Sequence, residues 1–512
     1  MRKWLIVLGC VLAILTIAAG VFINVRLEPI LKGRVEKLLA DRFSSGVAIG
    51  GLDFTLFPAG VTVTGVTLRH HHRTDVPPLI TIRRVTAQTD LLTLIFGANH
   101  AVKLVRLEGL QIRMKSGGSK NKESEAGEGH ARQQPSGGGG DHFPFIIREV
   151  IADGTLLQIL PKEAGKDPLE FDIQKLTLRS VGVNKPMAFV ATLTNAKPPG
   201  LIQTDGSFGP WQKDQPSTTP VSGRYTFDNA DLGVFKGIAG ILSSNGDYKG
   251  ELDRIEVKGT TDTPNFTVGS GHAVDLKTDF EATVDGTNGN TLLHPVDARF
   301  LNSEFICKGG VIGTPGKKGK AVQLDVVSKH AKIEDLLMLA LGSSEPLLKG
   351  PVSFKTKFVL PQGDASVLNR LFLDGRFDLV SAEFTSDKVQ DKIDALSNRS
   401  RGIHKPENQA DNVASNLAAR FVQKNGNIRF SRLSFQVPGA LISLTGAYGL
   451  RSEKIDFEGH ARFKADLSHM TTGWKSLLLK AVDPFFKKDG AGAVLPIKIT
   501  GTKSDPHFGL NL

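Results

Sequence analysis

The residues that could perform chemistry are few and far apart along the chain. His70, His71 and His72 are adjacent, and Asp75 follows shortly after them. Neighbouring side chains on a strand point to opposite faces, so at most two of these histidines could share a metal ion. We interpret the cluster as a solvated loop and predict no metal site.

A glycine- and lysine-rich segment, Gly313–Lys320, superficially resembles a phosphate-binding loop. That loop requires four residues between its first glycine and Gly-Lys, and then a serine or threonine. The spacing is absent here and Ala321 follows, so we predict a solvated hairpin tip; contact with a lipid headgroup is the alternative. The chain also lacks Gly-x-Ser-x-Gly and His-Glu-x-x-His. We therefore predict no catalytic residues, no cofactor and no enzymatic activity, although an enzyme whose site forms only in the fold is an alternative.

The composition favours apolar surface and anionic partners. Of the aromatic residues, 29 are Phe and only three each are Tyr and Trp, so most offer apolar area without a polar group. The formal net charge is +11, which favours phospholipid headgroups or acidic polymers. Nucleic acid is disfavoured because the basic residues form no dense block interleaved with aromatics. Two cysteines are too few for a Cys₄ zinc site.

The N-terminus predicts a membrane anchor. Arg2 and Lys3 precede an uncharged run from Trp4 to Val25, which would span about 33 Å as a helix. Charges before the run place the N-terminus in the cytoplasm and the remaining chain across the membrane. The large apolar residues assigned to the anchor are Trp4, Leu8, Leu12, Leu15 and Phe22.

Two further sequence features bear on the membrane anchor and on the segment that follows it. Ala18-Ala19-Gly20 is a weak cleavage signal, so a removed signal peptide is the alternative to an uncleaved anchor. Apolar residues from Leu27 to Leu39 then recur at helical spacing among charged ones. This amphipathic helix is expected to pack on the following sheet, or alternatively to lie at the membrane surface.

From residue 47 onward the apolar residues alternate with polar ones, which predicts strands with one apolar face. The turn signals Asp153-Gly154, Asn245-Gly246, Asp285-Gly286, Asp374-Gly375 and Asn425-Gly426 separate these runs. Glycine followed two residues later by an aromatic recurs, as in Gly375 and Phe377, and suggests a repetitive architecture. The candidate residues for the apolar face are Val61, Val63, Val66, Leu68, Phe171, Ile173, Leu176, Leu178, Leu433, Phe435, Val437, Ile442 and Leu444.

A few segments break the alternation. Residues 116–142 contain only two apolar residues and a run of four glycines, which predicts a flexible linker; residues 399–412 are a shorter version. Helical spacing appears within 232–242, 333–340, 389–396 and 474–481.

Three regions of the chain resemble the AsmA family of envelope proteins. The first is the membrane helix with its amphipathic helix, followed by Leu52–Pro58 (LDFTLFP). The second is Asp90–Gly97 (DLLTLIFG) with Val105–Ile112 (VRLEGLQI). The third is Gly490–Thr502 (GAGAVLPIKITGT) with Asp505–Phe508 (DPHF) at the end of the chain. Between them the likeness is only one of general pattern.

This resemblance implies a mainly β fold: an elongated, curled antiparallel sheet with an apolar groove and a few short amphipathic helices after the transmembrane helix. The expected segments are 1–26 (anchor), 27–115 (N-terminal module), 116–142 (linker), 143–465 (groove body) and 466–512 (C-terminal module). It implies a single-pass protein of the bacterial inner membrane, mostly periplasmic, that passively conducts phospholipids to the outer membrane. The alternative is an assembly factor that binds outer-membrane proteins in the same groove.

Overall fold

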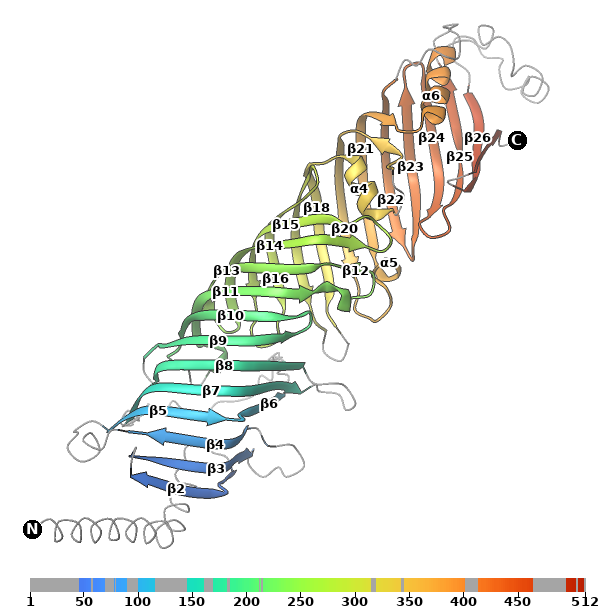
Figure 1. Cartoon of the computed structure of the whole chain (residues 1–512). Helices are drawn as coiled ribbons and strands as arrows, with labels where there is room; N and C mark the ends of the chain where they lie inside the picture. The colour runs from blue at the N-terminus through green and yellow to red at the C-terminus, as the bar shows by residue number, and fades with distance from the viewer. Residues whose placement is uncertain are drawn as a thin grey trace, which may run out of the picture. The chain divides into compact units, whose positions relative to one another are not determined.

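The computed structural model describes residues 46–56, 59–69, 78, 80–89, 100–115, 145–160, 169–181, 185–210, 212, 215–314, 319–341, 345–400, 413–463, 494–502 and 505–510. Strands dominate this part of the chain, and only a few short helices accompany them (Figure 1). The prediction of a mainly β fold is confirmed. No helix within these described ranges is long and apolar enough to cross a membrane.

Several predictions fall outside the described residues. These are the anchor with Trp4, Leu8, Leu12, Leu15 and Phe22, the amphipathic helix after it, the histidine cluster, the linker 116–142 and the helical pattern at 474–481.

The chain divides into two compact units. Unit 1 comprises residues 1–230, 245–257 and 284–289, and unit 2 comprises 231–244, 258–283 and 290–512. The strands of unit 1 are β1 (Gly46–Ala48), β2 (Gly51–Leu56), β3 (Ala59–Arg69), β4 (Ile80–Gln88), β5 (His100–Glu108), β6 (Gln111–Lys115), β7 (Phe145–Leu160), β8 (Leu169–Val181), β9 (Met187–Ala196), β10 (Pro199–Phe208) and all but the last residue of β11 (Pro220–Asp231). A 3₁₀ turn, η2 (Pro216–Thr218), precedes β11.

Unit 1 contains one departure from an antiparallel sheet. Strands β5 and β6 form one bent strand, interrupted at Gly109, whose φ of 63° few other residues adopt. Both pair antiparallel with β4 on one side, but both pair parallel with β7 on the other. The prediction of a purely antiparallel sheet is wrong here. Parallel neighbours need a long crossover connection, and in the sequence 29 residues separate the end of β6 from the start of β7.

Unit 2 contains the larger number of strands. They are β12 (Ile238–Ala239), β15 (Val274–Val284) except its last residue, β16 (Thr291–Phe300), β17 (Ser303–Ile312), β18 (Ala321–His330), β19 (Leu348–Lys349), β20 (Val352–Leu360), β21 (Phe372–Phe384), β22 (Ser415–Lys424), β23 (Asn427–Val437), β24 (Ala440–Gly449), β25 (Lys454–Phe463), β26 (Val494–Thr502) and β27 (Pro506–Leu510). Strands β13 (Ile241–Glu251) and β14 (Arg254–Val268) contribute residues to both units. From β20 to β27 every strand pairs antiparallel with the next one in the chain.

The described part of unit 2 contains three helices: α4 (Ile333–Ala340), α5 (Val367–Arg370) and α6 (Asp387–Ser400). The helical spacings at 333–340 and 389–396 therefore predicted helices correctly. The helix expected within 232–242 is wrong: the structure has a 3₁₀ turn, η3 (Leu232–Val234), followed by β12 and the start of β13. Gly237 and Gly240, at φ of 98° and 138°, interrupt any helix there.

Some glycines predicted to form turns instead lie inside strands. Asn425-Gly426 does connect β22 to β23, and Asp285-Gly286 follows β15. Gly154, Gly246 and Gly375, however, fall within β7, β13 and β21. A Cβ atom at Gly375 would lie only 2.6 Å from the carbonyl oxygen of Lys355. Glycine in a strand interior often marks such a close backbone approach, which allows the sheet to bend.

The sheet of unit 2 curls around one of its faces (Figure 1). Helix α4 follows β18, yet the carbonyl oxygen of Met338 accepts a hydrogen bond from the amide of His272, in the loop before β15, at 2.8 Å. Helix α5 follows β20, and its Val367 amide donates to the carbonyl oxygen of Lys236 at 2.9 Å. These contacts join segments that are several strands apart.

Candidate functional site

The concave side of the unit 2 sheet is defined by strand register, because directly opposed residues share a face. The inner-face residues of β20–β25 are Val352, Phe354, Thr356, Phe358, Leu360, Leu373, Gly375, Phe377, Leu379, Ala382, Phe384, Ser415, Leu417, Ala419, Phe421, Gln423, Ile428, Phe430, Leu433, Phe435, Val437, Ala440, Ile442, Leu444, Gly446, Tyr448, Ile455, Phe457, Gly459, Ala461 and Phe463. None of these positions carries a charged side chain. We call this set the inner face.

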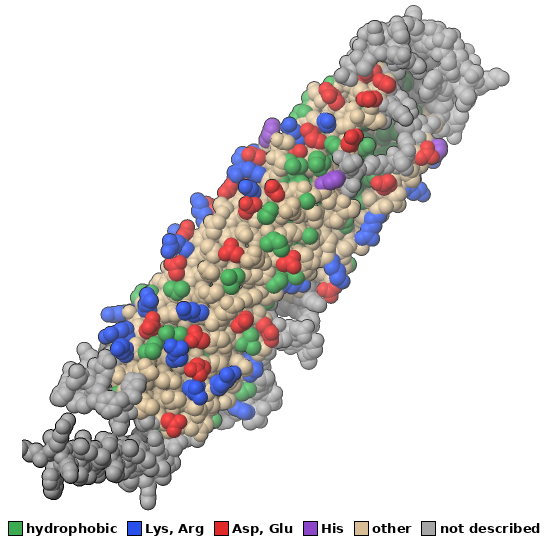
Figure 2. Space-filling model, in the orientation of Figure 1, with side chains coloured by type: hydrophobic (Ala, Val, Ile, Leu, Met, Phe, Trp, Pro, Cys, Tyr) green, Lys and Arg blue, Asp and Glu red, His purple; other side chains and the backbone are tan. Residues whose placement is uncertain are grey.

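The opposite face of the same strands is mainly polar. On β25 it presents Lys454, Asp456, Glu458, His460 and Arg462, all of them exposed. Figure 2 shows acidic and basic side chains interspersed over the visible surface. Solvent therefore contacts the outer face, and the apolar residues turn inward.

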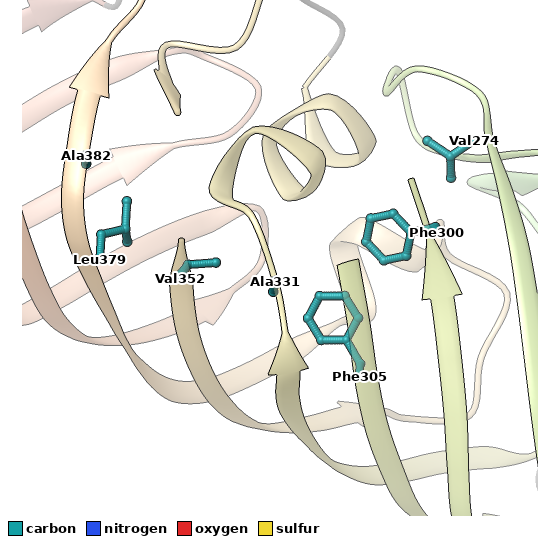
Figure 3. Close-up of a cluster of buried hydrophobic side chains, with 7 residues drawn as sticks. All are labelled: Val274, Phe300, Phe305, Ala331, Val352, Leu379 and Ala382. Carbon is teal, nitrogen blue, oxygen red and sulfur yellow. The ribbon is translucent and has the colours of Figure 1, made fainter. Parts of the chain in front are cut away.

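Burial is uneven along the inner face. One cluster of buried side chains lies near α4, at the ends of β16, β17, β18, β20 and β21, together with the start of β15 (Figure 3). Its members are Val274, Phe300, Phe305, Ala331, Val352, Leu379 and Ala382. A second cluster contains Val413, Phe435, Val437, Ala440, Ala461 and Phe463, and Ile393 of α6 packs against it. These clusters form the closed cores of unit 2.

Hydrogen bonds fix α4 over its cluster. Asp335 is 2% exposed, and its Oδ2 accepts from the Asn302 amide at 2.9 Å and from Ser303 Oγ at 2.7 Å. Ser303 Oγ in turn accepts from the Lys332 amide at 3.0 Å. The carboxylate thereby ties the helix to the turn between β16 and β17.

We expect Asp335→Ala to lower the free energy of unfolding by roughly 2–3 kcal/mol, because the buried Ser303 hydroxyl and the partly buried Asn302 amide lose their acceptor. Chemical denaturation measures the loss. Asp325→Ala, at an exposed position of β18, is the control and should change stability by less than ~0.5 kcal/mol. Equal midpoints for the two variants would contradict the anchoring role.

Helix α6 covers its cluster with polar groups as well. Asp394 Oδ1 accepts from the Val413 amide at 2.9 Å, and Ser397 Oγ donates to the carbonyl oxygen of Pro438 at 2.9 Å. Both side chains are buried. The helix therefore satisfies backbone groups where strands begin and end. The sequence pattern pointed only to its apolar residues, and missed this polar stripe.

Beyond the clusters, some residues of the inner face are buried, such as Phe421, Gln423 and Leu444, but several phenylalanines are only half-buried. Phe354, Phe358, Phe377, Phe430 and Phe457 all retain contact with solvent. Ring contacts connect the phenylalanines: the centroid distances are 6.4 Å for Phe305–Phe354, 6.3 Å for Phe354–Phe421 and 6.1 Å for Phe377–Phe421. Phe430 and Phe457 form a separate pair at 5.6 Å. The half-buried rings therefore form two aromatic patches, one around Phe421 and one made of Phe430 and Phe457, which the described residues cover only in part.

Two titratable groups, Cys307 of β17 and Tyr448 of the inner face, lie in an apolar environment. Burial raises the pKa of the Cys307 thiol to about 11, so the thiol is protonated at neutral pH and a poor nucleophile. Burial, with a smaller contribution from Glu453, also raises the pKa of Tyr448. Within the described residues no group of His, Cys, Asp or Glu could hold a metal ion. The arrangement is suited to contact with apolar molecules.

Unit 1 has an apolar inner face of its own. Register connects Val63 of β3 through Val85, Leu107 and Ala152 to Leu176 of β8. The row then ends in polar residues, where Thr204 Oγ1 lies 2.7 Å from Tyr248 Oη.

The structure places the predicted residues in two groups. Val61, Val63, Val66, Leu68, Phe171, Ile173, Leu176 and Leu178 lie on the inner face of unit 1. Leu433, Phe435, Val437, Ile442 and Leu444 lie together in unit 2, where Leu433 opposes Leu444 and Phe435 opposes Ile442. Phe435, Val437 and Leu444 are buried, whereas Leu433 and Ile442 are half-buried.

Sequence reasoning missed much of the aromatic surface of the inner face, including half-buried Phe354 and Phe358 and buried Phe421. The recurrence of glycine followed by an aromatic did include Gly375 with Phe377 and Gly446 with Tyr448, which all lie on the inner face. Extending that signal to neighbouring strands would have required their register.

Comparisons with known proteins identify no relative: no family model, no curated protein and no solved structure matches the chain. The resemblance to the AsmA family therefore stays a prediction.

Proposed function

We propose that this protein is a passive phospholipid carrier, in which acyl chains lie along the inner face while headgroups stay in water. The observation that carries the proposal is the uncharged inner face of β20–β25, on which several phenylalanines are only half-buried, including Phe354, Phe358, Phe377, Phe430 and Phe457. Exposing that much apolar surface is unfavourable, and large exposed apolar areas usually mark binding sites. Hydrocarbon chains would cover it without requiring hydrogen bonds.

The remaining parts of the proposal come from the sequence. The apolar run near the N-terminus would anchor the chain in the bacterial inner membrane, with the sheet in the periplasm. Phospholipids would then pass toward the outer membrane and support its biogenesis. The partners would be both membranes or outer-membrane proteins, with no nucleic acid and no catalytic step.

The test is a charge on the half-buried part of the inner face. We expect Phe457→Asp to reduce the phospholipid that co-purifies with the full-length protein, because an ionised carboxylate resists contact with hydrocarbon. The stability loss should be smaller than for a fully buried site, since the carboxylate can remain hydrated. Mass spectrometry of extracted lipid gives the stoichiometry, and transfer of a fluorescent phospholipid between vesicles gives the rate.

Leu441→Asp is the matched control, because Leu441 lies on the outer face of the neighbouring strand and is 36% exposed. It should leave lipid content and transfer unchanged. Wild-type protein without bound lipid, or equal lipid in both variants, would refute the proposal. Transfer should also proceed without nucleotide.

A further inference from the structure

Ion pairs between strands recur on the outer face of unit 2, both between adjacent strands and across an intervening strand. Lys258 Nζ lies 3.0 Å from Glu281 Oε1, and Lys329 Nζ lies 3.3 Å from Asp297 Oδ1. Opposite charges on adjacent strands stabilise a sheet, whereas like charges directly opposed destabilise it. One row of residues on the outer face departs from this pattern of opposite charges.

Four basic residues oppose one another across four successive strands. Lys355 of β20 opposes Arg376 of β21, which opposes Arg420 of β22, which opposes Arg432 of β23. All four side chains are exposed. Within the described part of the chain, none of the four forms an ion pair. We call these residues the basic row.

The four residues of the basic row lie along a line that crosses the sheet. Adjacent strands lie about 4.8 Å apart, so the row extends roughly 14 Å across the sheet. Asp374 and Asp378 flank Arg376 on its own strand, on the same face, and both are exposed. A flat anionic surface would meet these carboxylates as well as the basic row, and they would repel it. A narrow, extended anion could follow the row and avoid them.

The side-chain types of the basic row also suit a narrow, extended anion. Three of the four residues are arginines, whose planar guanidinium groups bind phosphate or carboxylate oxygens in pairs. Mutual repulsion within the row would be relieved by such an anion. Since the row lies on the outer face, lipid on the inner face would not block it.

We propose that the basic row is a binding site for a linear polyanion, a chain that carries successive phosphate or carboxylate groups. This site is separate from the lipid-binding proposal and does not depend on it. The ligand would be an acidic polymer that aligns across β20–β23.

The experiment compares two double variants of the full-length protein in mild non-ionic detergent. Arg376→Gln with Arg420→Gln removes the centre of the basic row, and Lys258→Gln with Lys329→Gln removes two basic side chains that have acidic partners. Both lose the same net charge. Binding of short-chain polyphosphate and of polyglutamate is measured by fluorescence anisotropy, which identifies the preferred anionic group.

We expect the first variant to lose affinity on the order of tenfold for at least one polymer, with a shallower salt dependence, and the second to change less than twofold. Equal loss in both variants, or none in either, would overturn the proposal. A difference seen only with phosphatidylglycerol vesicles, and with neither polymer, would overturn it in favour of a membrane surface.

Thermal melts of the two double variants show whether the substitutions change the stability of the sheet. Removing opposed like charges should leave the melting temperature of the first variant unchanged or higher at low salt. A lower melting temperature would mean that the basic row stabilises the sheet, and would also count against a site shaped for a ligand.

Discussion

Leu379→Asp is expected to unfold the cluster beneath α4, whereas Val380→Asp, one residue away, is expected to have almost no effect. Leu379 is 1% exposed and belongs to that cluster, while Val380 is 58% exposed on the other face. A carboxylate at position 379 would be buried without a partner, which costs about 4 kcal/mol or more. The exposed substitution should stay within ~0.5 kcal/mol.

The pair of variants tests which face of β21 is closed. Chemical denaturation gives the two free energies of unfolding, and near-ultraviolet circular dichroism reports the packing of the neighbouring phenylalanines. Similar losses for both variants would show that the assigned faces of β21 are wrong. Phe435, at 9% exposure in its own cluster, should behave like Leu379 rather than like a groove residue.

Shortening the segment 116–144 to six residues is expected to separate β7 from β5 and β6. Lys115 opposes Leu160 and His100 opposes Phe145, so the connection must return along the full paired length. At about 3.3 Å per residue that length is roughly 50 Å, which requires about 15 extended residues at minimum. Six residues cannot reach.

A Gly/Ser segment with all 29 residues of the original is the control. It should preserve the melting temperature to within a few degrees, because the composition of 116–142 offers almost nothing to bury. Hydrogen exchange of the β7 amides would locate any loss of pairing. Normal protection of β7 with six residues would contradict the parallel register.

The sequence predicted the pairing of strands that are close together in the chain better than it predicted the arrangement of distant segments. Alternating Leu433, Phe435, Ile442 and Leu444, with Pro438-Gly439 between the strands, predicted a hairpin that the structure confirms. Such a hairpin depends only on nearby residues and on turn chemistry.

The errors have a common origin in longer-range geometry. The sequence pattern predicts a turn at Gly375, but the role of this glycine depends on how closely the next strand approaches it. The parallel pairing of β5 with β7 follows from a crossover that no local pattern reveals. The basic row unites residues from four strands, and each of its members alone is an ordinary exposed cation on an alternating strand.

The pairing order of unit 2 has a consequence for how it folds. Because β20 to β27 pair with their neighbours in the chain, most of their contacts are close in sequence. Low contact order favours rapid folding, and each completed hairpin offers an edge on which the next strand can add. The sheet can therefore assemble progressively as the chain emerges, without waiting for its C-terminus. Gain or loss of one hairpin would change its length while leaving the remaining pairings intact.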